Sequence, residues 1–164
     1  MTDRFNALSA LVQSGHPLSA EALAIFYKIF SNEALVIDKW FALQAGASDR
    51  GGNILPTVRQ LLQHPDFSMK NPNRARSLVF SYCNANPGAF HRSDAAGYVF
   101  WSDRVLEMDA TNPQVAARLA RALDRWSHLA EPYRSAAKVA IERVAAKPDL
   151  SNDVREVVSR ALSQ

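Results

Sequence analysis

The segment NPNRARSLVFSYCNANPGAFH, residues 71–91, is the most informative stretch for the fold. A helix is expected to begin at Pro72, because proline suits the first position of a helix, and most of its circumference is apolar. Two arginines, Arg74 and Arg76, lie in its first turn. The helix dipole makes that end positive, so cations there are unfavourable on their own. Something outside the helix must therefore bind them.

Outward from this segment, helix signals recur along the whole chain, and strand signals are nearly absent. Capping residues, apolar residues at helical spacing and breakers mark the ends. Nine helices are expected, beginning near Asp3, Ser19, Asn32, Pro56, Pro72, Ala95, Asn112, Pro132 and Ser151. No sequence repeat of fixed length is visible, so a regular armadillo or tetratricopeptide array is not supported. We predict an all-α fold, an irregular superhelical solenoid of antiparallel helix pairs in a single domain, residues 1–164.

The composition is that of a soluble globular protein, with 48% hydrophobic and 21% charged residues. No run approaches the roughly 18 apolar residues of a membrane span, and the start MTDRFNALSA lacks the features of a secretory signal. The single cysteine, Cys83, excludes an intrachain disulfide and is expected to be a small buried hydrophobe. A cytoplasmic protein with no membrane partner is expected.

No catalytic or metal-binding constellation is visible in the chain. HExxH, GxSxG and a phosphate-binding glycine loop are all missing, and the four histidines are widely separated. The closest approach to a catalytic pair is His91 with Asp94, for which a helix cap at Asp94 is the simpler interpretation. We therefore predict no catalytic residue, no metal ligand and no cofactor within this chain.

The arginines are the most informative polar residues, since fourteen of the nineteen basic residues are arginine. Arg118, Arg121, Arg125 and His128 are expected to form one row beside the apolar face of the helix that Asn112 and Pro113 begin. A solvated face with local pairing, such as Arg121 with Asp124, is the alternative. Arg76 has only apolar neighbours on its helix, so it needs a carboxylate from elsewhere or a ligand. A net charge of +3 with interspersed acids argues against a nucleic-acid partner.

The chain resembles the C-terminal domain of bacterial aminopeptidase N, a family of zinc aminopeptidases of the gluzincin type. The resemblance covers essentially the whole chain in order. It is carried by the strings MTDRFNALSAL, LVIDKWFALQA, TVRQLLQHPDFSMKNPNRARSL, NPGAFHRSDAAGYVFW and NPQVAARL.

The resemblance implies a non-catalytic helical domain that covers the active site and helps admit and bind peptide substrates. The zinc ion and the catalytic residues would lie in a catalytic domain that is absent from this chain and is its expected partner. The positions that match cavity-facing arginines of the family are Arg76 and Arg118, which are the predicted substrate-binding residues. An arginine there would suit a peptide that extends away from the zinc, because a guanidinium binds a carboxylate in a bidentate manner. The alternative is that either arginine pairs with an acid of the catalytic domain.

One alternative function remains open from the sequence. A free-standing helical scaffold that binds a protein or peptide on its concave face would use the same fold and the same arginines. Such a protein would have a reading frame that begins at Met1, whereas the aminopeptidase interpretation requires an HExxH-bearing domain upstream. The preferred N-terminal residue of a substrate and the oligomeric state are not encoded in any recognisable pattern.

Overall fold

The computed structural model describes all residues 1–164, and every regular element in it is helical. The all-α class is therefore confirmed. The chain divides into two compact units, residues 1–68 with 73–89 and residues 69–72 with 90–164. A single domain over residues 1–164 stays a prediction. None of the helices combines the length and the apolar character that a membrane span requires.

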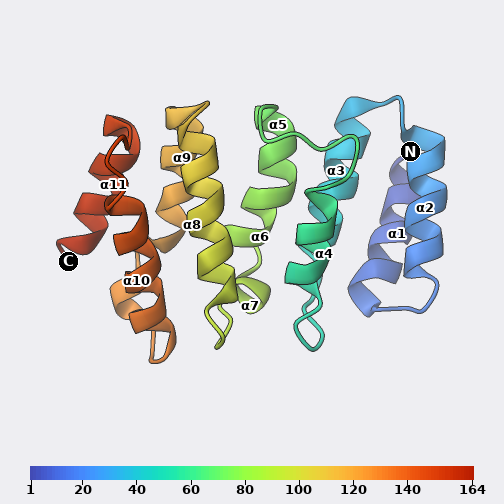
Figure 1. Cartoon of the computed structure of the whole chain (residues 1–164). Helices are drawn as coiled ribbons and strands as arrows, with labels where there is room; N and C mark the ends of the chain where they lie inside the picture. The colour runs from blue at the N-terminus through green and yellow to red at the C-terminus, as the bar shows by residue number, and fades with distance from the viewer. The chain divides into compact units, whose positions relative to one another are not determined.

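The first unit is built around one buried helix, α3. Its elements are α1 (Thr2–Ser14), α2 (Ser19–Phe30), α3 (Ala34–Ala45), α4 (Ile54–Leu61), α5 (Pro72–Ala75), the π-helical η1 (Arg76–Phe80), α6 (Ser81–Cys83) and, at its border, α7 (Pro87–Phe90). Helices α1 and α2 form an antiparallel pair (Figure 1), and α3 packs against α2, α4 and η1. Ile37 and Phe41 of α3 are almost completely buried. A helix that is apolar on most sides belongs in the interior, as α3 does.

Residues 72–83 form one continuous helix that contains a π-helical turn. The segments α5, η1 and α6 follow one another without a break, and the amide of Ser81 donates to the carbonyl of Arg76, five residues earlier. Such turns carry one extra residue and are frequent at functional sites. With this helix counted once, the chain has the nine expected helices and the short additional α7. Cys83 at its end is 4% exposed, so its prediction as a buried hydrophobe is confirmed.

The second unit consists of four main helices and two short 3-10 segments. Its elements are α8 (Ala96–Asp109), α9 (Pro113–Ala120), the 3-10 segments η2 (Arg121–Leu123) and η3 (Trp126–His128), α10 (Tyr133–Ala145) and α11 (Asn152–Leu162). Helix α8 contacts α9 and α10, and α11 contacts the same two helices. Two buried tryptophans link these helices: Trp101 Nε1 donates to the carbonyl of Leu119 at 3.0 Å, and Trp126 Nε1 to that of Ala161 at 2.9 Å.

The expected helix ends are accurate where a side chain caps the helix. Asn112 and Ser151 accept hydrogen bonds from the amides of Val115 and Val154, as N-caps do. Helix α4 instead begins at Ile54, two residues before Pro56, because Asp49 accepts the amide of Ile54 from the preceding loop. The start of α4 is therefore set by a contact with the loop, and the spacing of apolar residues does not reveal such a contact.

Candidate functional site

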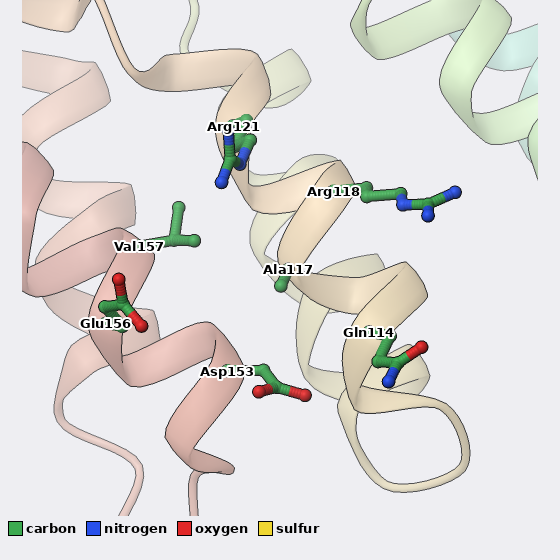
Figure 2. A pocket seen from close by; sticks show the side chains of 7 residues that line it. All are labelled: Gln114, Ala117, Arg118, Arg121, Asp153, Glu156 and Val157. Carbon is green, nitrogen blue, oxygen red and sulfur yellow. The ribbon is translucent and has the colours of Figure 1, made fainter.

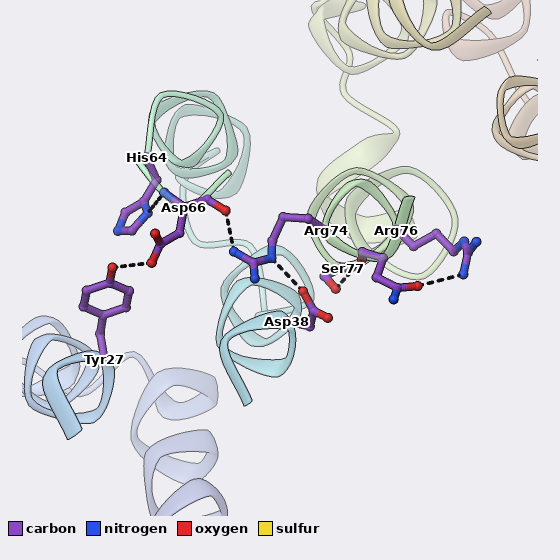
Figure 3. A network of polar contacts seen from close by, with 8 residues as sticks. Tyr27, Asp38, His64, Asp66, Arg74, Arg76 and Ser77 are labelled. Atoms are coloured by element: carbon purple, nitrogen blue, oxygen red, sulfur yellow. Dashed lines mark hydrogen bonds and ion pairs between the residues drawn. The ribbon is translucent and has the colours of Figure 1, made fainter. Parts of the chain in front are cut away.

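Arg74 is paired within the chain and is 7% exposed. Its Nε donates to Asp38 Oδ1 at 2.7 Å, its Nη1 donates to the carbonyl of Asp66, and its guanidinium lies over the ring of Phe41 at 5.2 Å (Figure 3). Asp38 belongs to α3, which packs against the helix that carries Arg74. One of the two arginines in the first turn is therefore satisfied internally, and it stabilises the unit.

The contacts of Arg74 extend into a larger polar network, drawn in Figure 3. The hydroxyl of Tyr27 on α2 donates to the Asp66 carboxylate, and the amide of Asp66 donates to His64 Nδ1 at 3.1 Å. The hydrogen bond to Asp66, together with burial, raises the pKa of the Tyr27 hydroxyl. The ring of His64 also packs against Tyr27 and Trp40, with centroids 5.0 and 5.4 Å apart. This network fixes the loop after α4 to α2, α3 and α5.

Arg76, only two residues further on, has a different environment. It is exposed and is the first residue of the π-helical turn. Its one hydrogen bond is from Nη1 to Asn73 Oδ1 at 3.3 Å, and no carboxylate of the chain forms an ion pair with it. Figure 3 shows its side chain extending away from Arg74 and Asp38. The guanidinium therefore remains available to an anion from outside the chain.

Arg118 belongs to the second unit and lines a groove between α9 and α11. The groove has a volume of about 500 Å³ and is lined by Gln114, Ala117, Arg118, Arg121, Asp153, Glu156 and Val157 (Figure 2). Arg118 comes from α9 and Arg121 from η2, whereas Asp153 and Glu156 come from α11. Arg118 is exposed, no ion pair involves it, and its side chain extends away from α11 in Figure 2. Like Arg76, it has no acidic partner in the chain.

The expected single row of Arg118, Arg121, Arg125 and His128 is wrong. Helix α9 ends at Ala120, and the following residues form 3-10 turns, so the four side chains do not share one α-helical face. The alternative of an Arg121–Asp124 pair is not observed as an ion pair. Arg121 influences Asp124 only through its charge. Burial raises the pKa of the Asp124 carboxyl, and the charges of Arg121 and Arg160 partly offset that rise.

Asp94 lies just before the start of α8, but the N-cap residue is Ala95 and no side chain forms the N-cap hydrogen bond, so the cap interpretation of Asp94 is only partly right. Asp94 Oδ1 accepts the amide of Ala96 at 3.0 Å, and both carboxylate oxygens accept from Arg92. The bonds from Arg92 and from the Ala96 amide lower the pKa of Asp94 to about 2. His91 instead forms a hydrogen bond to the Tyr98 hydroxyl at 2.7 Å, and burial lowers its pKa. The two side chains therefore have separate partners and do not form a catalytic pair.

Sequence reasoning did not identify Asp38 as the partner of Arg74. The pair joins residues 36 positions apart, which no local pattern reveals. A signal was nevertheless present in VIDKWF, residues 36–41, where Asp38 lies beside Lys39 in a helix that is otherwise mostly apolar. A carboxylate in such a position requires a cation. No three His, Cys, Asp or Glu side chains are grouped closely enough to hold a metal ion.

Comparisons with known proteins agree with the fold and with the resemblance. The family described as a domain of unknown function (DUF3458_C) with ARM repeats matches residues 1–163. The aminopeptidases N of Caulobacter vibrioides, Haemophilus influenzae and Escherichia coli are 41%, 40% and 38% identical over 99% of the chain. The chain spans 18% of the length of each of these relatives.

A solved structure gives the same result. Legionella pneumophila aminopeptidase A, crystallised with aspartic acid, has a segment that superimposes with a TM-score of 0.91 and 27% identity. The match covers 99% of this chain and 19% of that one. The family description names ARM repeats, so the expectation against an armadillo array, which rested on the lack of a visible sequence period, is corrected. The match of residues 1–163 shows that the chain belongs to the DUF3458_C family of ARM-repeat domains, and its resemblance to the C-terminal domain of aminopeptidase N is confirmed.

Proposed function

We propose that this chain is the non-catalytic helical domain of a zinc-dependent aminopeptidase N of the cytoplasm, where it covers the active site and helps bind peptide substrates. The observation that carries the proposal is the identity of 38–41% with three aminopeptidases N over 99% of the chain. The zinc ion and the catalytic residues are assigned to the part of such a protein that this chain does not cover. That part is the proposed partner.

The proposed substrate contacts are Arg76 and Arg118. Both are exposed, and neither forms an ion pair within the chain. Arg74 shows the opposite case, since its guanidinium is bound by Asp38 and Asp66. An aminopeptidase holds the free amino end of its substrate at the metal, so the carbonyls and the terminal carboxylate extend toward whatever covers the site. A guanidinium without an internal acid can bind that carboxylate directly.

The covering role is tested by reconstitution. This chain and the remaining part of the parent protein are produced separately, each is shown to be folded by circular dichroism, and aminopeptidase activity on a tripeptide is measured before and after mixing. The proposal predicts that mixing raises activity above that of either piece. The chain carrying Arg59→Ala, which changes an exposed arginine of α4, should restore activity equally. Absence of recovery with two folded pieces contradicts the covering role.

The parent gene distinguishes this function from a free-standing scaffold. An aminopeptidase requires a reading frame that encodes an HExxH-bearing domain upstream of the codons for residues 1–164. A reading frame that begins at Met1 and encodes only residues 1–164 would contradict the proposal and favour a helical scaffold that binds a protein or peptide.

A further inference from the structure

A second pocket lies within the first unit, and neither Arg76 nor Arg118 contributes to it. Its volume is about 420 Å³, and it is surrounded by α1, α2, α3, α4 and the glycine-rich loop of residues 46–53. The apolar lining comes from Val12, Pro17, Ala20, Leu23, Ala47 and Ile54. Gln44, His16 and Arg50 also line it. A mostly apolar pocket with a few converging polar groups is the usual form of a small-molecule site.

Gln44 supplies the most specific feature of this pocket. The residue is 8% exposed, and its Nε2 donates to the carbonyl of Trp40 at 3.1 Å. Because that carbonyl can only accept, the amide nitrogen must face it, and Oε1 must point the other way. No hydrogen bond within the chain reaches Oε1. Oε1 is not fully enclosed, so water reaches it, and it can accept a hydrogen bond from water or from an N–H of a ligand.

Most hydroxyl groups around the pocket already donate hydrogen bonds within the protein. Ser19 Oγ donates to the carbonyls of Leu11 and His16, and Thr57 Oγ1 donates to that of Asn53. His16 Nδ1 accepts the amide of Leu18 at 3.1 Å, so in this geometry Nε2 carries the proton of a neutral ring. The hydroxyls therefore offer a ligand few donors, whereas the Nε2–H of His16 stays available.

Arg50 supplies positive charge at the rim. Its Nη2 donates to the carbonyl of Gln13 at 2.9 Å, which leaves other N–H donors of the guanidinium unused. The side chain lies against Gly15, where a Cβ atom would be 2.5 Å from Arg50 Nε, so a larger residue there would require Arg50 to shift. No acidic side chain lines the pocket. A carboxylate is therefore the expected polar group of a ligand at the rim.

The walls of the pocket are held in place without a ligand. Asp49 accepts the amides of Gly52 and Ile54, and Asn53 Oδ1 accepts the amide of Arg50 at 2.8 Å. Ser48 contacts Gln13 Oε1 on α1 through its amide at 3.3 Å. A pocket fixed in this way loses little conformational entropy on binding.

We infer that this pocket binds the carboxyl-terminal residue of a peptide, or an N-acylated amino acid, with an aliphatic side chain. The carboxylate would be bound by Arg50 and the Nε2–H of His16. The amide N–H of the same residue would donate to Gln44 Oε1, and the aliphatic side chain would contact the apolar lining. A free ammonium group fits less well, because no carboxylate is present to pair with it. This inference does not depend on the proposed function.

The test is a titration of this chain with three small probes by isothermal calorimetry or ligand-observed NMR. N-acetyl-L-leucine carries all three recognised groups and is expected to bind saturably, with a dissociation constant on the order of millimolar for its size. N-acetyl-L-leucinamide lacks the carboxylate, and 4-methylpentanoate lacks the amide N–H. Each is expected to bind about tenfold more weakly or worse. The acetyl group blocks the free amino end that an aminopeptidase requires, so the result is independent of that activity.

Three variants locate the site. Arg50→Gln is expected to abolish the preference for N-acetyl-L-leucine over its amide, and Gln44→Met to abolish the preference over 4-methylpentanoate. Arg59→Gln, an exposed arginine of α4 that does not line the pocket, should leave both preferences unchanged. Thermal unfolding of each variant shows whether it is folded. Absence of saturable binding to the folded wild-type chain, or equal binding of the acid and the amide, would overturn the inference.

Discussion

The network around Arg74 in the first unit and the groove beside Arg118 in the second show two uses of arginine. Arg74 is buried and is bound by Asp38 and by the carbonyl of Asp66, both from other segments of its unit. Arg118 is exposed, and its groove offers acids that do not pair with it. Arg76 resembles Arg118 and not its near neighbour Arg74. Position in the sequence therefore does not decide the role of an arginine, whereas the presence of an internal acceptor does.

Removal of Arg74 is expected to give the largest loss of stability. Arg74→Ala leaves Asp38 without its cation in a position where its side chain is only 16% exposed. Breaking a buried ion pair from one side costs about 3–5 kcal/mol. Urea unfolding should show this decrease in the free energy of unfolding, while Arg59→Ala stays within about 0.5 kcal/mol of the wild type. A decrease no larger than that of the control would remove the distinction between the two kinds of arginine.

The buried side-chain amide of Asn86 provides a second test of how strongly hydrogen bonds within the chain stabilise the fold. Asn86 Nδ2 donates to the carbonyls of Ala45 and Ala47, each at 2.8 Å, and so holds the end of α3. Asn86→Ala leaves both carbonyls without this donor and is expected to lower the free energy of unfolding by about 1–3 kcal/mol. The exposed Asn84 is the matched control, and Asn84→Ala should have little effect. Equal effects of the two substitutions would contradict the assigned role of Asn86.

The Arg92–Asp94 pair predicts a smaller, pH-dependent effect in the second unit. The pKa of Asp94 is lowered to about 2 from 3.8, so the charged carboxylate stabilises the folded state above its ordinary pKa. This contribution is lost as the pH falls through about 2. The stability difference between wild type and Asp94→Asn should therefore be present at neutral pH and shrink steadily below about pH 4, near the unfolded pKa. A difference that does not change with pH would contradict stabilisation by the charged Asp94 carboxylate.

The smallest change in the free energy of unfolding is expected for a substitution in the groove between α9 and α11. Arg118 has no acidic partner, so Arg118→Ala should leave the free energy of unfolding within about 0.5 kcal/mol of the wild type. Chemical denaturation beside Arg74→Ala provides the comparison. A loss as large as that of Arg74→Ala would mean that Arg118 stabilises its unit and is not reserved for a ligand.

The sequence predicts local features of this chain better than its long-range contacts. Asn112 and Ser151 mark the starts of α9 and α11, because a cap depends on residues three positions apart. The end of α9 at Ala120 is not predicted, since the apolar spacing continues into the 3-10 turns that follow. The π-helical turn that begins at Arg76 has no sequence signal of its own, because the sequence RSLVF contains no glycine or proline that distinguishes it from the α-helix on either side.

The same limit applies to the candidate site. Arg76 and Arg118 could be selected from the sequence because they are arginines without an obvious local acid. The pairing of Arg74 with Asp38 and the unpartnered side-chain oxygen of Gln44 depend on how distant segments pack, and periodicity contains no information on that. Whether Arg76 and Arg118 contact substrate stays a prediction.

The most direct test of the central proposal is the kinetics of Arg76→Ala in the complete parent enzyme, on substrates of increasing length. If Arg76 binds the trailing carboxylate equally in the ground and transition states, KM rises and kcat stays nearly unchanged. The loss in kcat/KM should be roughly 10- to 150-fold for tri- and tetrapeptides and small for a single-residue amide reporter. Arg118→Ala should show the same pattern more weakly. A loss that is equal for all substrate lengths and accompanied by a lower melting temperature would contradict substrate binding by Arg76.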